Sequence, residues 1–295
     1  MSNKLKIIPL GGLGEVGKNM MAYEIDNHIL VVDAGMMFPE NDMIGVDYII
    51  PDFEYLYDKS HQVDGIIITH GHEDHIGAIQ HVLSRIPAPV FGTNLTLGLV
   101  EVKLARNGMA AKADLRPIRA GETIQIGPFT VDFFHVCHSI PDAVGLGITT
   151  KAGLVVHTGD YKFDHTPVDG KASDYARLAN YSEHGVLALL ADSTNSERAG
   201  WTPSEKVVDA GLEDVFSQAA GRIIIASFAS MPWARRSMAK STIMMAFFLT
   251  MPISITTPIM AITERSMPAS SSMTKAPMPA EGRPDRMVSG WMKLS

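Results

Sequence analysis

The segment 69–77, THGHEDHIG, constrains the fold of this chain more than any other feature, because it brings three histidines and one aspartate into six residues. It follows the apolar run 65–69 (GIIIT), which is typical of a buried strand, and it precedes apolar residues at helical spacing. His70 and His72 lie two positions apart, so their side chains point the same way on an extended backbone. Asp74 and His75 fall where the chain turns into the helix.

Packing does not explain this cluster, since four buried polar side chains would need polar partners. Imidazole and carboxylate groups are the ligands expected for zinc. His138 and Asp160 follow two further expected strands, 129–135 and 154–158. Functional groups of layered α/β proteins gather at strand ends, so we expect both residues to join the cluster in a metal site. The spacing is not the helical His-Glu-x-x-His of zinc proteases.

The remaining pattern predicts an α/β protein with helices outside its sheets. Apolar runs or alternation between turn residues indicate strands, and a 3.6-residue apolar period indicates helices. Strands are expected at residues 6–10, 20–24, 28–33, 65–69, 89–92, 123–126, 129–135, 145–150, 154–158, 185–191 and 222–228, and helices at 76–86, 95–105 and 205–218.

Residues 12–17 (GLGEVG) match the G-x-G-x-x-G pattern of dinucleotide-binding proteins. That pattern requires a helix directly after the glycines, whereas residues 20–24 are typical of a strand. We therefore expect a tight turn beside the metal site and no dinucleotide.

The order His-x-His-x-Asp-His, followed at a distance by a histidine and an aspartate, resembles the metallo-β-lactamase superfamily. The segments KLKIIPLGGLGEVGKNM, VDAGMMFPE, GVDYIIPDF, THGHEDHIGA, CHSIPDAVG, HTGDYKFD and ADSTNSERAGWTPSE are similar to the ribonuclease J family, in the β-CASP branch of that superfamily. The resemblance covers residues 4–230. It implies an αββα sandwich that is incomplete here, without the β-CASP and C-terminal domains of the family.

The resemblance also implies a centre of two Zn²⁺ ions, with Mn²⁺ as a substitute. His70, His72 and His138 would hold one ion, Asp74 and His75 the other, and Asp160 would bridge them. Asp74 and His75 are the expected catalytic residues. Family members take one more histidine for the second zinc from further downstream, and no histidine follows His184 in this chain.

Four other residues are weaker candidates. Asp192 and Ser193 end an expected strand, where they either support the metal ligands or cap the following segment. Gly45 and Asp47 match a segment at which some members of the family hold a calcium ion. Cys137 adjoins an expected ligand but reads as a buried strand residue and not as a nucleophile.

The composition changes abruptly near Ser230. All 11 histidines precede that residue, whereas 11 of the 18 methionines follow it. Residues 1–230 hold 17 Lys and Arg against 29 Asp and Glu, and residues 231–295 hold 8 against 3. The second part shows neither helical nor strand periodicity and is rich in Pro, Ser and Thr. We expect a partial metallo-β-lactamase domain over residues 1–230 and an unrelated tail, frame-shifted or disordered, that can be deleted without loss of stability.

The single cysteine excludes an internal disulfide and favours a cytoplasmic location. The formal net charge of −7 argues against nonspecific binding of nucleic acid, but it leaves room for binding through metal ions. No membrane association is expected, because the one strongly apolar stretch of the tail is short and contains Pro252.

The resemblance implies a zinc-dependent ribonuclease that cleaves RNA inward from the 5′ end and internally, in RNA processing, including that of rRNA, and decay. Family members of full length form homodimers or homotetramers. For this chain we expect weak or no activity, since a metal ligand and half of the RNA channel are missing. The alternatives are a hydrolase of small lactams or thioesters, and a metal-binding fragment without catalysis.

Overall fold

The computed structural model describes residues 4–40 and 42–219. The expected strand at 222–228 and the tail 231–295 lie outside the described residues. Within the described part, none of the helices is both long enough and apolar enough to cross a bilayer.

The first sheet has six strands in the order β1-β2-β3-β4-β5-β6. Strands β1, β2 and β3 pair antiparallel, since short connections join them. The pairs β3–β4, β4–β5 and β5–β6 are parallel, and parallel strands require longer crossover connections. The strands are β1 (Lys6–Gly11), β2 (Met20–Ile25), β3 (His28–Val32), β4 (Val63–Ile67), β5 (Val90–Gly92) and β6 (Leu115–Pro117).

The second sheet has five strands in the order β11-β10-β9-β8-β7. Strands β7 to β10 form an antiparallel meander, and β11 lies parallel to β10 at the edge. The strands are β7 (Thr123–Ile126), β8 (Phe129–His135), β9 (Val144–Thr150), β10 (Gly153–His157) and β11 (Ala188–Leu190).

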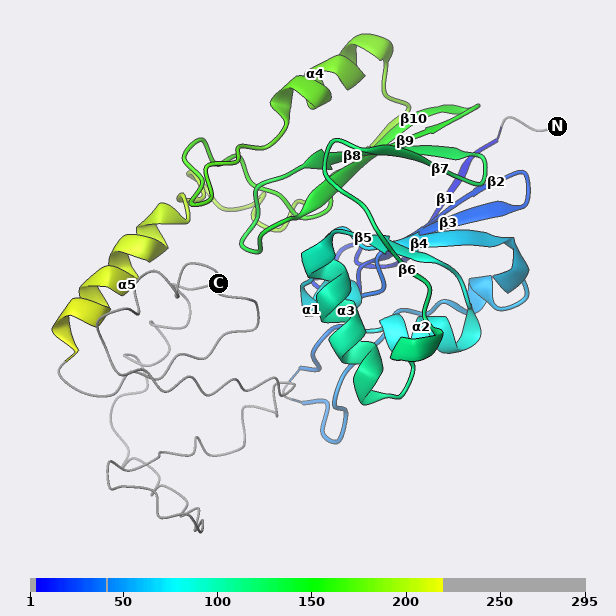
Figure 1. Ribbon diagram of the computed structural model, residues 1–295, viewed down its shortest axis with the longest axis horizontal. Coiled ribbons are helices and arrows are strands. Elements are labelled where there is room, and N and C mark those ends of the chain that lie inside the picture. Colours follow the sequence, from blue (N-terminus) through cyan, green and yellow to red (C-terminus); the bar gives the residue numbers. More distant parts are fainter. Residues whose placement is uncertain (1–3, 41, 220–295) are drawn as a thin grey trace. The chain divides into compact units, whose positions relative to one another are not determined.

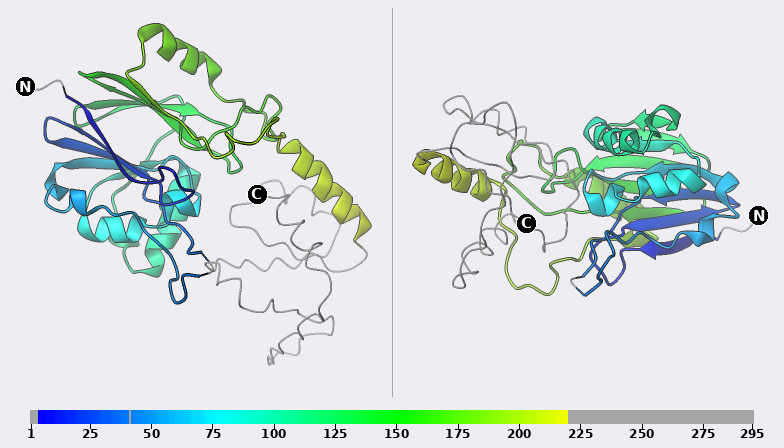
Figure 2. Two further views of the ribbon diagram at one scale, coloured as in Figure 1. Left: turned by 180° about the vertical axis from the view of Figure 1, so that it is seen from behind. Right: turned by 90° about the horizontal axis from the view of Figure 1, so that it is seen from below.

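The helices lie outside the two sheets. Figures 1 and 2 show α2 and α3 over the outer face of the first sheet and α4 over the outer face of the second. The α-helices are α1 (Glu73–Ile76), α2 (Ile79–Arg85), α3 (Asn94–Arg106), α4 (Tyr175–His184) and α5 (Lys206–Gln218), and the short 3₁₀ turns are Glu54–Leu56, Ser60–Gln62 and Ala110–Lys112.

Three apolar clusters separate these layers. One packs the first sheet against α2 and α3, and a second fills the space between the sheets, with Tyr23 and Leu30 opposite Phe133 and Leu146. The third holds α4 on the second sheet through Tyr181. Alternate residues of each inner strand therefore face different cores, as the two-residue period of a strand requires. The result is the expected αββα sandwich.

Several details differ from the sequence prediction. The expected helix 76–86 is two short helices, α1 and α2, and β4 begins and ends two residues earlier than predicted. Residues 185–191 are not a buried strand, because Leu187 and Leu189 are more than half exposed at the sheet edge. Strand β6 and helix α4 were not predicted. As predicted, a strand, β2, and not a helix follows the glycine loop.

Candidate metal centre

The predicted cluster lies at one end of the sandwich, between the two sheets. His70 and His72 follow β4, and His72, in extended conformation, forms the N-terminal boundary of α1. His138 follows β8 and Asp160 follows β10, so these two residues come from the other sheet. The prediction that strand ends bring these residues together is confirmed.

The turn that carries the ligands is held by backbone hydrogen bonds from outside it. Its carbonyl groups at residues 73, 74 and 75 accept from the N–H groups of Met36, Asn19 and Ala34 at 3.1, 3.0 and 2.8 Å. The Glu73 carbonyl still accepts from the N–H of Gly77 at 2.7 Å, but the N–H of Ala78 donates to Ala34 and not to Asp74, so α1 ends after one turn. The segment at Gly35 packs so closely that a Cβ there would lie 1.5 Å from the carbonyl oxygen of Asp74.

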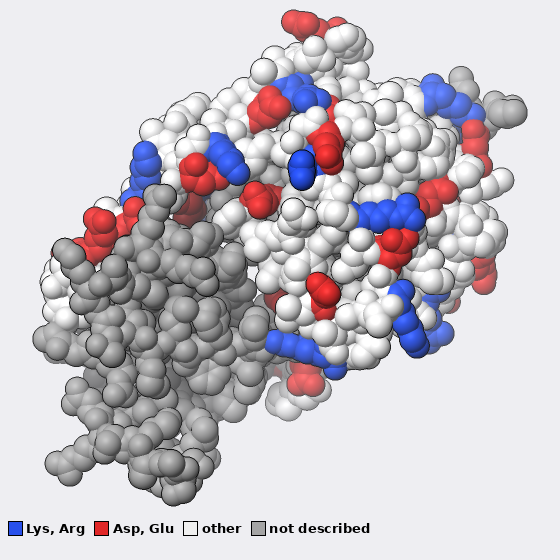
Figure 3. Space-filling view, in the orientation of Figure 1, with Lys and Arg blue, Asp and Glu red and all other residues white. Residues whose placement is uncertain are grey.

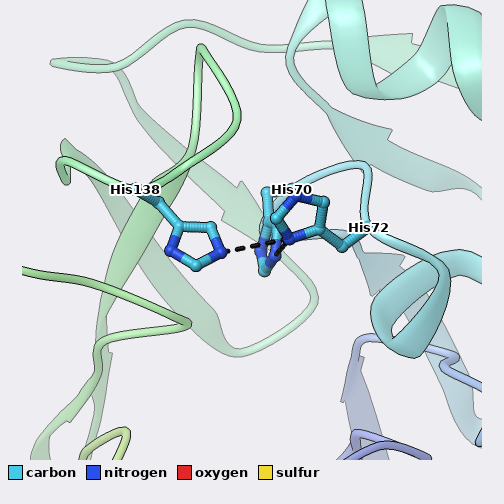
Figure 4. A group of neighbouring side chains, drawn as sticks. All are labelled: His70, His72 and His138. Carbon is cyan, nitrogen blue, oxygen red and sulfur yellow. Dashed lines mark hydrogen bonds between the residues drawn. The ribbon is translucent and has the colours of Figure 1, made fainter. Parts of the chain in front are cut away.

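His70, His72 and His138 form the first group of potential ligands. Figure 4 shows the three rings converging from the loops after β4 and β8. His72 Nδ1 lies 3.1 Å from His70 Nε2 and 3.1 Å from His138 Nε2. One imidazole nitrogen offers a single hydrogen or a single lone pair, so His72 Nδ1 cannot make a full hydrogen bond to both neighbours.

His70, His75 and Asp160 form the second group. Asp160 faces both groups, because its Oδ1 lies 3.3 Å from His75 Nε2 and its Oδ2 lies 3.7 Å from His138 Nε2. Asp74 lies beside the second group, because its Oδ2 is 3.6 Å from His75 Nε2. The geometry is therefore compatible with a carboxylate that bridges two adjacent ions.

The electrostatics of the first group favour a cation. Burial, together with His75, His138 and His72, lowers the pKa of His70 well below its usual range. Burial and His72 also lower the pKa of His138, to about 3, so both rings are neutral and offer lone pairs. Burial alone would raise the pKa of Asp160, but His75 and the other imidazoles outweigh it and set this pKa at about 2.

His75 differs from the other histidines. Its burial acts to lower its pKa, but Asp33 and Asp160 raise that pKa well above the usual range. A metal ion at His75 therefore has to displace a proton.

The donor set fits a divalent metal ion. Ring nitrogens bound to one zinc at about 2.0–2.1 Å lie roughly 3.3 Å apart in a tetrahedron, close to the 3.1 Å spacings around His72. An ion at this point would satisfy three lone pairs that cannot satisfy one another. A carboxylate held in its ionised form completes a set of nitrogen and oxygen ligands.

Asp33 is a functional residue that the sequence analysis missed. Its carboxylate is almost fully buried at the end of β3, and its Oδ2 lies 2.8 Å from His75 Nδ1. The same carboxylate accepts from the backbone N–H and the hydroxyl of Thr69. Asp33 thus fixes the ring of His75 with Nε2 toward the second group. The only sequence signal for Asp33 is its place in the segment VDAG, where a lone aspartate directly follows an apolar strand.

The four weaker candidates stay predictions. Asp192 and Ser193 line the same cavity as Asp74, His75 and Asp160. The carboxylate of Asp192 accepts from the N–H and the hydroxyl of Thr194, as in a local turn. Gly45 and Asp47 lie on an exposed loop, and the groups of three potential metal ligands among residues 4–40 and 42–219 do not include Asp47.

A cavity of about 940 Å³ opens beside the second group. Its walls are formed by the glycine loop after β1, the end of β11 and residues 191–198. Arg198 contributes a cationic side chain to these walls. On the face shown in Figure 3, residues of both charge signs alternate over the described part.

The sequence was compared with known protein families and proteins. The pattern of the metallo-beta-lactamase superfamily matches residues 13–199. Ribonuclease J of Helicobacter pylori (strain ATCC 700392 / 26695) is 46% identical over 227 residues, which are 77% of this chain and 33% of that protein. Ribonuclease J2 of Bacillus subtilis (strain 168) is 46% identical over 229 residues, 78% of this chain and 41% of that protein. The chain thus spans about a third to two fifths of the length of these relatives.

A solved structure shares the fold. The crystal structure of a protein of unknown function from Enterococcus faecalis V583 superimposes with a TM-score of 0.54 and 16% sequence identity. The match covers 75% of this chain and 59% of that protein. At this identity the similarity concerns the architecture alone.

Proposed function

Since the chain belongs to the metallo-β-lactamase superfamily and is similar to the N-terminal part of ribonucleases J, we propose that it carries the zinc-binding centre of a ribonuclease of that type. The observation that supports this most directly is Asp160, whose two oxygens face two adjacent groups of histidines. Two adjacent divalent ions would suit hydrolysis of a phosphodiester bond. RNA would be the substrate, with cleavage from the 5′ end and at internal positions.

The bound ions would supply an activated water and neutralise the charge of the phosphate oxygens. The protein's own residues have three further tasks. Asp160 would hold both ions, Asp33 holds the ring of His75 in one orientation, and Asp74 would accept the proton of the attacking water. Asp74 is suited to this because its side chain is 31% exposed toward the cavity and lies 3.4 Å from the amide of Asn19, which can orient it.

The test is cleavage of a 5′-monophosphorylated, end-labelled RNA by the whole chain in the presence of Zn²⁺ or Mn²⁺. We expect slow cleavage, so the protein is used in excess over the RNA. Chelation should abolish the reaction, and Asp74→Ala should slow it by about 100-fold or more, as loss of a general base does.

Two outcomes would contradict the proposal. Hydrolysis of a chromogenic lactam or a thioester, with intact RNA, would assign the site to small substrates. Intact RNA in protein with both metal sites filled would indicate a metal-binding part without catalysis of its own.

A further inference from the structure

Tyr23 and His157 form a polar contact between the two sheets, next to the metal centre. Tyr23 lies on β2 and is fully buried in the core between the sheets. His157 is the last residue of β10, three positions before Asp160. The Tyr23 hydroxyl lies 2.7 Å from His157 Nδ1, and the two rings meet edge to face at 72°.

This contact determines which ring nitrogen of His157 carries the hydrogen. Within residues 4–40 and 42–219, His157 is the hydrogen-bond partner of the Tyr23 hydroxyl. If His157 donated from Nδ1, the hydroxyl hydrogen of Tyr23 would be buried without an acceptor, which is costly. The hydroxyl therefore donates to Nδ1, and the hydrogen of the neutral ring sits on Nε2. Burial favours the neutral ring because it lowers the pKa of His157.

The N–H at Nε2 is accessible to a ligand, because Nε2 has no partner among the described residues and yet is not buried: the buried side-chain atom without a partner there is the Tyr175 hydroxyl oxygen. His157 lines the 940 Å³ cavity together with His75 and Asp160. In the part of the chain that the structure describes, Nε2 makes no hydrogen bond. A donor at this place can bind an anionic oxygen without adding a buried charge to a wall that already holds Asp33, Asp74 and Asp160.

We propose that His157 is a substrate-binding residue whose Nε2–H donates a hydrogen bond to a phosphate oxygen of an RNA strand lying in this cavity. The inference rests on the proposed function for the identity of the ligand. A purely structural pair would instead serve only to tie β2 to β10, and it would have no need of a donor facing the cavity.

Two conservative variants separate these roles. His157→Gln places an amide N–H near the position of Nε2, whereas His157→Asn places its amide near Nδ1, where Tyr23 lies. We expect His157→Asn to bind a phosphorothioate RNA dinucleotide about tenfold more weakly than wild type, the size of one hydrogen bond to a charged group, and His157→Gln to bind it within about threefold. Weaker binding by the Gln variant with full binding by the Asn variant would overturn the proposal.

A second measurement reports on the wild-type ring itself. In zinc-loaded protein with ¹⁵N-labelled histidine, NMR should show His157 protonated at Nε2, with a shift of that nitrogen when the dinucleotide is added and none with uridine. His81, whose Nε2 lies 3.1 Å from the Tyr48 hydroxyl, is the internal control. A hydrogen on Nδ1, or an unchanged Nε2 signal at saturation, would overturn the proposal even if RNA is cleaved. A shift without RNA cleavage would support it while the proposed function fails.

Discussion

At the scale of single residues, the six predicted ligands converge, but the residue that orients one of them was not predicted. Adjacent polar residues after a buried strand are visible in the sequence, and His70, His72 and His75 lie within one short segment. The partner of His75 is Asp33, 42 positions away. Such a contact depends on the parallel pairing of β3 with β4, which residue spacing does not reveal.

Replacing Asp33 by asparagine should weaken the second metal site. The Oδ1 atom accepts from the backbone N–H of Thr69, and Oδ2 accepts from His75 Nδ1. An asparagine has to turn its NH₂ group toward one of these donors, so the ring of His75 loses its orientation. We expect the affinity for the second metal ion to fall by about 10–100-fold, with little change at the three-histidine group. Metal titration followed by elemental analysis measures both sites.

The control for this variant is Asp64→Asn. Asp64 forms the same kind of pair with His28, at 2.9 Å, on the surface and away from the metal ligands. Equal metal affinity in Asp33→Asn and Asp64→Asn would show that Asp33 does not position His75.

Gly35→Ala should disrupt the turn that carries the ligands. The added Cβ would lie 1.5 Å from the Asp74 carbonyl oxygen, so either Gly35 or the turn has to move. We expect a loss of stability of about 3 kcal/mol or more, as for a steric clash in a packed core, together with weaker binding at the second site. Denaturant unfolding and metal titration test this expectation.

Gly98→Ala is the matched control. Gly98 lies in α3, and a Cβ there meets open space. This variant should gain up to about 1 kcal/mol, because alanine favours a helix. A Gly35→Ala protein as stable as Gly98→Ala would contradict the tight packing at Gly35.

At the scale of elements, strands with clear patterns were predicted closely and irregular ones were not. Thr123–Ile126 and Phe129–His135 have the expected bounds, because alternating burial on two faces marks them. Strand β6 escaped prediction since it has three residues and ends at a proline, which only an edge strand tolerates. The helix pattern of residues 76–86 is interrupted by hydrogen bonds from a distant segment, which no local pattern encodes.

Helix α4 was missed although the sequence contains its boundary signals. Asp174 accepts from the N–H of Arg177 as an N-cap, and Gly185 follows the last helical residue with φ of 84°. Its apolar stripe is short, since only Tyr181 is buried within the helix and Leu178 packs beside it half-buried. Arg177 and Tyr181 instead fasten it to Asp132 of β8.

Glu24 should make the stability of the first sheet dependent on pH. Burial acts to raise the pKa of Glu24, but hydrogen bonds from Lys59, Lys6 and Tyr55 hold it at about 2. Because this pKa lies below the unfolded value of 4.5, the contribution of Glu24 is complete above pH 4.5 and is lost as the pH falls toward 2.

Glu24→Gln tests this direction of the pH dependence of stability. The variant should be about 1–2 kcal/mol less stable than wild type at pH 7, since hydrogen bonds to a charged group are replaced by weaker ones. The difference should shrink as the pH is lowered below 4.5. Urea unfolding of both proteins between pH 3 and 7 measures it, and a difference that grows in acid would show that the carboxylate is not stabilised by its partners.

At the scale of the whole molecule, the metal centre joins the two sheets. His70 and His72 belong to the loop after β4 of the first sheet, and His138 follows β8 of the second, so one ion would connect both (Figure 4). An ion that binds only the folded chain stabilises it by about 2.7 kcal/mol at 100 times its dissociation constant. Removing the metal with a chelator should therefore lower the midpoint of thermal unfolding by roughly 5–10 °C.

Two variants decide whether this shift comes from the proposed centre. His138→Ala removes the ligand of the second sheet, so the chelator should change its midpoint much less than that of wild type. His184→Ala removes an exposed histidine whose Nδ1–H donates to the Asn180 carbonyl of its own helix, and its shift should equal that of wild type. In the His138→Ala variant Asp160, which follows β10, would be the remaining ligand from the second sheet, so a smaller part of the shift should persist. A chelator shift in His138→Ala as large as that of wild type would show that the three-histidine group does not hold a stabilising metal ion.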